Sequence, residues 1–339
     1  MEAYAEKEKT ERAKNKGQLI VDATCTPADI RYPNDMSLLN ESRENAERII
    51  DFMHRLKPRS EGKPRDYRVN AHRAFIEYTK KRRPGVKIRR KALRKQLNYL
   101  KRDIRFIDEY LTVIDKDQIP FKIIKRLKVV RDLYEQQKQM FQRNERRVDH
   151  RIVSVSQPHV RPIVRGKAGT PVEFGAKISL SLCEGFCYID HLSWENFNEA
   201  NDLKSQIETY RKRNGYYPES VHADKIYQNR ENRKYCKELG IRMTGKPLGR
   251  PVKITEKNKG KLKEERKQRY QDDVDRIAIE GRFGVGKRKY GLGLIKSKLK
   301  ETSESDIHLS ILVMNLDKIG NEEMKKIKNR YKIAREKAS

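Results

Sequence analysis

Two aspartates occupy apolar, strand-like stretches of the sequence. Asp22 lies inside the β-type run Gln18–Thr24, and Asp224 ends a second short β-type run that follows Pro218. A carboxylate in a buried strand is costly unless it is paired or binds a metal ion. The chain has 48 Asp and Glu residues, so a solvated surface position is the default for any single acid. The strand context is what distinguishes these two.

The stretch Asp275–Gly291, DRIAIEGRFGVGKRKYG, supplies a third candidate acid and has two opposed interpretations. It contains G-x-x-x-x-G-K, the spacing of a phosphate-binding loop. Such a loop follows a buried strand and continues with Ser or Thr, whereas here a charged, helical pattern precedes it and an Arg follows. On a helix, Arg276 and Glu280 share one face, and Lys287 returns to it seven residues later. We favour a catalytic acid between two cations that hold DNA phosphate; an ordinary Arg–Glu surface pair is the alternative.

Together, Asp22, Asp224 and Glu280 predict metal-dependent phosphodiester chemistry. Carboxylates that a fold brings together repel one another, which raises the pKa of at least one of them, and divalent cations remove this conflict. Two Mg²⁺ ions about 3.5–4 Å apart can activate a water or a 3′-hydroxyl and stabilise the leaving oxygen. Carboxylate and water ligands suit Mg²⁺. We therefore predict these three residues as catalytic metal ligands for two Mg²⁺ ions, for which Mn²⁺ can substitute.

The charge balance points to a polyanionic partner. The 339 residues carry a formal net charge of +31, with a pI of about 9.9. Such an excess is self-repelling in a compact protein unless a polyanion neutralises it. Double-stranded DNA is the leading partner because Lys and Arg release the counterions condensed on its phosphates, and an acidic membrane surface is the rival. No run approaches the ~20 apolar residues that span a bilayer, and the N-terminus lacks the apolar core of a signal peptide.

The four cysteines, in a chain of this length, do not indicate a disulfide scaffold. Cys183 and Cys187 have three residues between them and no matching Cys or His pair nearby, so a zinc site is not expected. Reduced thiols are the simple interpretation. We expect a cytoplasmic, nucleoid-associated protein.

Residues 36–150 have an almost wholly helical pattern. Apolar residues recur at alternating steps of four and three from Leu93 to Ile114, which is an a/d seam. The pattern resumes after Pro120, which predicts an antiparallel helical hairpin. We favour packing within the chain for this seam over a homodimer zipper. The run Lys80–Arg105 holds thirteen Lys or Arg and one Asp, and a one-signed density of this kind predicts phosphate contact. The predicted DNA-binding residues there are Lys80, Lys81, Arg82, Arg83, Lys87, Arg89, Arg90, Lys91, Arg94 and Lys95.

From residue 151 onward the pattern changes to β-type runs alternating with helices. Arg151–Gln157 and Pro171–Trp194 are rich in Val, Ile, Phe and Tyr, and Glu184-Gly185 divides the second run into a plausible hairpin. A helix over 195–215, a strand ending at Asp224, a second helix stopping at Gly240, a further strand and two late helices follow. Without the helical segment 36–150, the predicted order of elements is that of a mixed sheet with alternating β and α units. The predicted divisions are 1–35, 36–150 and 151–339.

Four stretches resemble bacterial insertion-sequence transposases of the Asp-Asp-Glu class. They read LIVDATCTPADIRYPND, EFGAKISLSLCEGF, VHADKIYQNRENRKYCKELGIRMTG and RIAIEGRFGVGKRKYGLG. The resemblance implies an α/β fold with a ribonuclease H-like mixed sheet and flanking helices, interrupted here by a long α-helical insertion after the first strand. It also implies that one acid lies on the first strand, one follows the fourth strand and a Glu lies on a later helix. These correspond to Asp22, Asp224 and Glu280.

The family signature around the glutamate is Tyr, two residues, Arg, three residues, Glu, six residues, Lys. Arg276, Glu280 and Lys287 fit this spacing, whereas Asp273 stands at the Tyr position. Relatives usually carry a helical DNA-binding segment before the first catalytic strand, and only 21 residues precede Asp22. We therefore expect the catalytic part of a transposase without the usual end-recognition segment.

The resulting hypothesis is a transposase that cleaves the DNA strands of an insertion sequence and transfers them, by two-metal chemistry. A catalytically inactive, truncated transposase that acts as a basic DNA-binding or regulatory protein is the alternative. The enzyme requires Mg²⁺ or Mn²⁺, whereas a DNA-binding protein would show only a steep dependence on salt. A regulatory protein would dimerise through the seam between Leu93 and Ile114.

Overall fold

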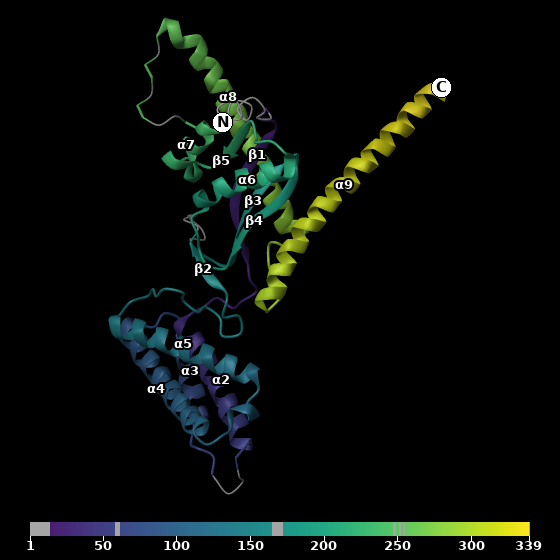
Figure 1. Cartoon of the computed structure of the whole chain (residues 1–339). Helices are drawn as coiled ribbons and strands as arrows, with labels where there is room; N and C mark the ends of the chain where they lie inside the picture. Colours follow the sequence, from purple (N-terminus) through teal and green to yellow (C-terminus); the bar gives the residue numbers. More distant parts are fainter. Residues whose placement is uncertain are drawn as a thin grey trace, which may run out of the picture. The chain divides into compact units, whose positions relative to one another are not determined.

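The computed structural model describes residues 14–57, 62–164, 172–246, 249–250, 252–253 and 255–338. The chain divides into two compact units. One consists of Met1–Asp29 with Ile163–Ser339, and the other of Ile30–Pro162. Figure 1 shows the sheet with its helices in the first unit and a bundle of helices in the second. The helical unit therefore begins six residues before the predicted segment 36–150 and ends twelve residues after it.

A curled mixed sheet of six strands forms the centre of the first unit. The strands are β1 (Gln18–Pro27), β2 (Arg161–Val164), β3 (Val172–Cys183), β4 (Phe186–Ser193), β5 (Ser220–Ala223) and β6 (Arg242–Met243). Their order is β2-β3-β1-β5-β6, with β4 also paired to β3. β1 is antiparallel to β3 and parallel to β5, and β5 is parallel to β6. The mixed α/β sheet with flanking helices follows the prediction.

The β3–β4 connection is the predicted two-residue turn. Glu184 has φ 50° and Gly185 has φ 80°, so both residues adopt the left-handed conformation that a tight hairpin turn of matching twist requires. Cys183 pairs with Phe186 directly across the turn. The local sequence therefore determines the register of the strand pairs next to the turn. Farther along the hairpin, an irregularity between Ser179 and Leu180 shifts that register.

Helices cover the sheet. They are α6 (Leu203–Asn214), α7 (Arg230–Glu238), α8 (Glu256–Lys289) and α9 (Lys300–Ala338). α6 buries Leu203, Ile207 and Tyr210 against a core that includes Val21 of β1 and Val221 of β5. α8 packs on β1 and β5, and α9 packs on β4. None of the helices within the described ranges has a stretch long and apolar enough to cross a membrane.

The helical unit has a core of its own. It contains α2 (Asp35–Arg55), α3 (Arg68–Thr79), α4 (Val86–Leu111) and α5 (Phe121–Arg143). Along the predicted seam, Leu97, Leu100, Ile107 and Ile114 are buried with residues of α2 and α5. The prediction that this seam packs within the chain is confirmed. The seam stabilises the helical unit by burying apolar surface, and each Å² buried contributes about 25 cal/mol to the free energy of folding.

Two stretches differ from the predicted elements. Arg151–Gln157 forms no strand in the structure; Ile152 and Val155 instead join the helical core. Gln136 of α5 accepts a hydrogen bond from the Ile152 amide at 2.9 Å. The backbone N–H of Ile152 therefore has a partner without the neighbouring strand that a β-sheet would provide. Residues 195–198 are not helical, because the Asn198 side chain accepts from the Ala200 amide and starts a 3₁₀ turn there.

Candidate active site

The pairing of β1 with β5 brings two of the predicted acids together. Val21 pairs with Ala223 across the parallel strands, and the next residue on each strand is Asp22 and Asp224. Asp224 continues the extended backbone, with φ −66° and ψ 163°. Because successive side chains alternate between faces and Val21 and Ala223 face the α6 core, both aspartates belong to the opposite face. That face is the one on which α8 packs.

Helix α8 supplies the third acid. Ile279 is fully buried and Phe283 is 8% exposed, so these two side chains anchor the middle of the helix. Arg276, Glu280 and Lys287 line the same cavity as the two aspartates. The helix continues unbroken through Gly281 to Lys289, which excludes the phosphate-loop interpretation of this stretch, since such a loop would precede a helix rather than lie inside one.

The three predicted acids and two predicted cations therefore line one cavity of about 880 Å³. The cavity lies in the sheet unit, between the middle of β1, the C-terminal end of β5, the 3₁₀ turn of Glu199–Asp202 and α8. Its charged lining residues are Asp22, Lys177, Glu199, Asp224, Arg276, Glu280 and Lys287. Acidic and basic groups thus share the cavity, as a site for a cation and a phosphate requires.

Burial sets the ionisation of Asp22. Its surroundings raise the pKa of this carboxyl to about 6, chiefly because burial disfavours the charged form, with further contributions from Glu199 and Asp224. One carboxylate oxygen accepts a hydrogen bond from the Ala23 amide at 2.8 Å, which opposes the rise. Arg276 opposes it as well. The carboxyl therefore lacks a positive charge close enough to offset its burial.

Arg276 and Glu280 form an i,i+4 ion pair at 3.0 Å. The ordinary Arg–Glu pair that was the alternative is thus present, but its two side chains also line the cavity. The Glu280 side chain is 51% exposed and that of Arg276 is 27% exposed, so the pair itself adds little stability. Both groups remain accessible to a ligand in the cavity.

Two further charged residues in the cavity were not predicted. Glu199 follows an Asn-rich loop in which no periodic pattern marks it, and Lys177 lies on β3. Their side chains form an ion pair and are 16% and 14% exposed. Lys177 also donates to the Phe197 carbonyl at 2.8 Å. The sequence placed Glu199 inside the predicted helix 195–215 and gave no signal for a site there. Its proximity to Asp22 is a property of the tertiary structure.

The donor set suits Mg²⁺ or Mn²⁺. Asp22, Asp224, Glu280 and Glu199 offer carboxylate oxygens, which are the ligands that hard divalent cations prefer. Burial raises the pKa of Asp22, and the neighbouring carboxylates of Glu199 and Asp224 add to this rise. Cys25 also lines the cavity, although this residue is only 1% exposed. The described lining residues include no second Cys and no His, so they lack the ligand set of a typical zinc site. The four cysteines are buried free thiols, as expected.

A second group of possible metal ligands lies where α8 meets β5. Ligand atoms of His222, Asp272 and Asp275 lie within 4.8 Å of one another. Asp272, however, accepts two hydrogen bonds from Arg242, at 2.7 and 2.9 Å. Burial alone would raise the pKa of Asp272, but the hydrogen bonds from Arg242 and Gln268 outweigh it and lower that pKa. A cation here would have to displace the guanidinium, so we interpret the group as the attachment of α8 to β5 and β6.

The predicted DNA-binding residues of the helical unit lie at its surface. They occupy the end of α3, the turn after it and the first half of α4. Arg90 is half-buried, and it donates to Asn144 at 3.0 Å. The exposed residues are Lys80, Lys81, Arg82, Arg83, Lys87, Arg89, Lys91, Arg94 and Lys95. Their contact with DNA stays a prediction.

Residues 221–317 match the family model described as "Transposase DDE domain". The matched segment begins in β5, just before Asp224, and includes all of α8 with Glu280. No curated protein matches the chain. The match supports a DDE-type transposase, which is the family that the sequence resembled.

Proposed function

Taking the match over residues 221–317 as the premise, we propose that the chain is a DDE transposase that cleaves DNA strands and transfers them for an insertion sequence. The observation that carries the proposal is the strand register that places Asp22 beside Asp224, in one cavity with Glu280. If the short edge strand β2 is not counted, Asp22 lies on the first strand and Asp224 follows the fourth. That order fits a ribonuclease H-like catalytic domain.

Asp22, Asp224 and Glu280 would hold two Mg²⁺ ions, or Mn²⁺ in their place. When bound there, the metal would help to ionise an attacking water or 3′-hydroxyl and would stabilise the leaving oxygen. Glu199 lies close enough to raise the pKa of Asp22 and is a fourth carboxylate available to the same cations. Its pairing with Lys177 fixes its orientation.

The cations of the cavity would hold the DNA phosphate. Arg276 and Lys287 lie on the same helix as Glu280 and line the cavity with it. A guanidinium can bind phosphate through two parallel hydrogen bonds, whereas an ammonium acts as a point charge. Held in this way, the scissile phosphate would meet the carboxylates with its orientation already fixed, which is a large part of the catalysis of phosphodiester cleavage.

Substitution of Glu280 tests the proposal. Glu280→Gln removes one metal ligand and keeps the side-chain shape, so we expect strand nicking with Mn²⁺ to fall at least a hundredfold, an order typical of the loss of a catalytic group. Binding to DNA carrying the element ends should be retained within about threefold, because backbone contacts dominate affinity. Glu265→Gln, an exposed position on the same helix, is the matched control. Nicking by Glu280→Gln at the rate of the control would exclude the assignment.

A further inference from the structure

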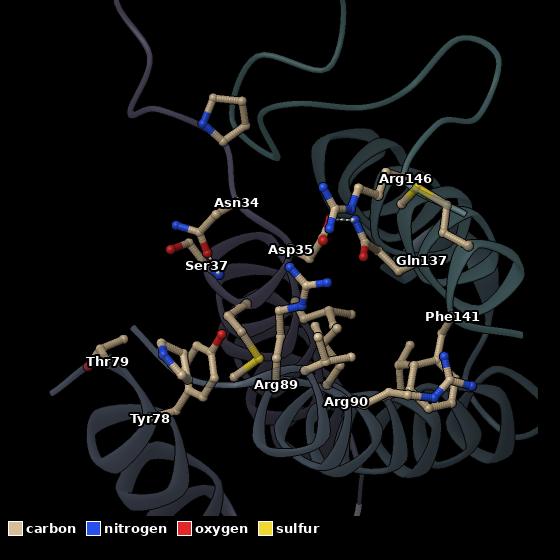
Figure 2. Close-up of a pocket in the computed structure, with 18 of the residues that line it drawn as sticks. Asn34, Asp35, Ser37, Tyr78, Thr79, Arg89, Arg90, Gln137, Phe141 and Arg146 are labelled. Carbon is tan, nitrogen blue, oxygen red and sulfur yellow. Dashed lines mark hydrogen bonds between the residues drawn. The ribbon is translucent and has the colours of Figure 1, made fainter. Parts of the chain in front are cut away.

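The helical unit contains a second charged cavity, which has no part in the carboxylate site. It has a volume of about 810 Å³ and is lined by the N-terminus of α2, the turn between α3 and α4, and the C-terminal end of α5 with the loop that follows. Figure 2 shows side chains from these segments converging on it. All its lining residues belong to the unit Ile30–Pro162.

The cavity is strongly cationic. Its six basic lining residues are Arg31, Lys81, Arg89, Arg90, Arg146 and Arg151, and its two acidic ones are Asp35 and Glu145, which leaves a net charge of +4. Arg151 donates to Asp35 at 2.8 Å, and Gln137 donates to the same carboxylate at 3.2 Å. Asp35 is therefore already neutralised from within the protein. Of the remaining charged lining residues five are basic and Glu145 alone is acidic, which leaves the excess of positive charge facing the cavity.

Besides Arg90, which has no ion pair but donates to Asn144, four of the basic residues have no ion pair within the part of the chain that the structure describes. They are Arg31, Lys81, Arg89 and Arg146. Arg31, Arg89 and Arg146 come from three separate segments, namely the stretch before α2, the start of α4 and the loop after α5. Like charges held together around one cavity are unfavourable unless an anion binds between them. The arrangement thus favours a ligand with several negative charges.

Aromatic side chains accompany these cations. Arg90 lies over the ring of Phe141, with its guanidinium 4.5 Å from the ring centroid. Tyr78 lies on the other side of Arg89 from Phe141 and is half-buried (Figure 2). No ring stacking or cation contact involves Tyr78 among the described residues. An aromatic ring that lines a cavity beside arginines without ion pairs is a combination by which proteins bind unpaired nucleic acid strands.

We infer that this cavity binds an unpaired DNA strand, with backbone phosphates on Arg31, Arg89 and Arg146 and a base against Tyr78. A lone phosphate ion would leave most of the 810 Å³ unfilled and would not use the aromatic face. An acidic peptide would satisfy the charge but has no reason to need the Tyr78 ring. The inference rests on the proposed function in one respect, since it takes DNA rather than RNA as the strand.

Binding of a labelled unpaired oligothymidine by the full chain tests the inference. All variants carry Glu280→Gln, so that the strand is not cut, and anisotropy is measured over a range of salt concentrations. Arg89→Gln and Arg146→Gln should each weaken binding about tenfold at low salt and lower the salt slope by about 0.7, the value per phosphate of a single strand. Tyr78→Leu should weaken binding about fivefold with the slope unchanged, because stacking releases no counterions.

Arg73→Gln is the matched control, because Arg73 is an exposed arginine on α3 that does not line the cavity. The inference is overturned if Arg89→Gln, Arg146→Gln and Tyr78→Leu all bind the strand as Arg73→Gln does. Polyglutamate that binds as tightly, and loses affinity in the same variants, would assign the cavity to an acidic peptide instead.

A parallel nicking assay separates this inference from the proposed function. If the wild-type chain fails to nick DNA but the cavity variants lose strand affinity, the binding site stands and the transposase proposal fails. If the wild-type chain nicks and Glu280→Gln does not, while the cavity variants bind like Arg73→Gln, the proposed function stands and the cavity is not a strand site.

Discussion

At the scale of single residues, the burial of Asp22 predicts that metal binding at the proposed site depends on pH. Its pKa is raised to about 6, so below that pH a proton occupies the carboxyl and competes with the metal. We expect the affinity for Mn²⁺, measured by calorimetry or by the electron paramagnetic resonance signal of free Mn²⁺, to fall as pH decreases from about 7 to about 5. Asp22→Asn should bind weakly at every pH. Equal affinity of the wild-type chain at the two extremes would contradict this account.

The buried carboxyl of Asp103 leads to a similar prediction for the pH dependence of the free energy of unfolding. It is fully buried on α4, and neither carboxylate oxygen has a hydrogen-bond partner within the described structure. Burial, with a contribution from Glu47, raises its pKa to about 8. Between about pH 4 and pH 8 the folded chain keeps a proton that the unfolded chain has released, so the free energy of unfolding falls as pH rises.

Asp103→Asn should remove much of this decline. Urea unfolding followed by far-UV circular dichroism should show a stability that changes less between pH 5 and pH 8 in the variant, by on the order of 1–3 kcal/mol. Asp108→Asn, at an exposed position of the same helix, is the control and should keep the wild-type slope. A variant with an unchanged slope would show that Asp103 ionises normally.

At the scale of elements, the position of α8 decides whether Glu280 reaches the aspartates. Besides Ile279 and Phe283, the contacts of Asp272 with Arg242 attach this helix to the sheet. Asp272 is 4% exposed, whereas the Arg242 side chain is 43% exposed. Screening therefore reduces the contribution of the pair, and we expect Asp272→Asn to cost about 1 kcal/mol.

The same substitution should slow nicking. Glu280 lies eight residues, about two turns, beyond Asp272 on the helix, so a loosened attachment widens the range of positions that Glu280 samples. Unfolding is followed by the fluorescence of Trp194, the single tryptophan, which is buried and donates to Glu304 at 2.9 Å. A nicking rate equal to that of Glu265→Gln would show that the pair does not position the catalytic acid.

Most elements could be predicted because their signals are local. The β3–β4 turn follows from Glu184-Gly185, and α7 ends before Gly240, which has the left-handed φ of 67°. Arg151–Gln157 could not be predicted in this way. Its alternating apolar residues fit a strand, but the Gln136 side chain and the helical core provide the partners instead. Alternation of apolar and polar residues in a sequence indicates which residues are buried. It does not indicate which other elements of the fold pack against them.

At the scale of the whole molecule, the net charge of +31 predicts a steep dependence of DNA binding on salt. Replacing Lys80, Lys81 and Arg82, all exposed, by Gln should lower the slope of log affinity against log salt for duplex DNA by about 2–3. Each phosphate contact contributes about 0.9. Filter binding or anisotropy between low and physiological salt measures the slope. A slope equal to that of the wild-type chain would remove this segment from the DNA-binding surface.

The sequence by itself determined the excess of basic residues, the helical seam, the strand around Asp22 and the helix with Arg276, Glu280 and Lys287. These depend on composition and on periods of two and 3.6 residues, which are local properties. Only the tertiary structure decided that Val21 pairs with Ala223, that Glu199 and Lys177 join the acids, and that arginines of three separate segments share one cavity. Such contacts depend on strand register and helix packing between distant parts of the chain, and no local pattern records them.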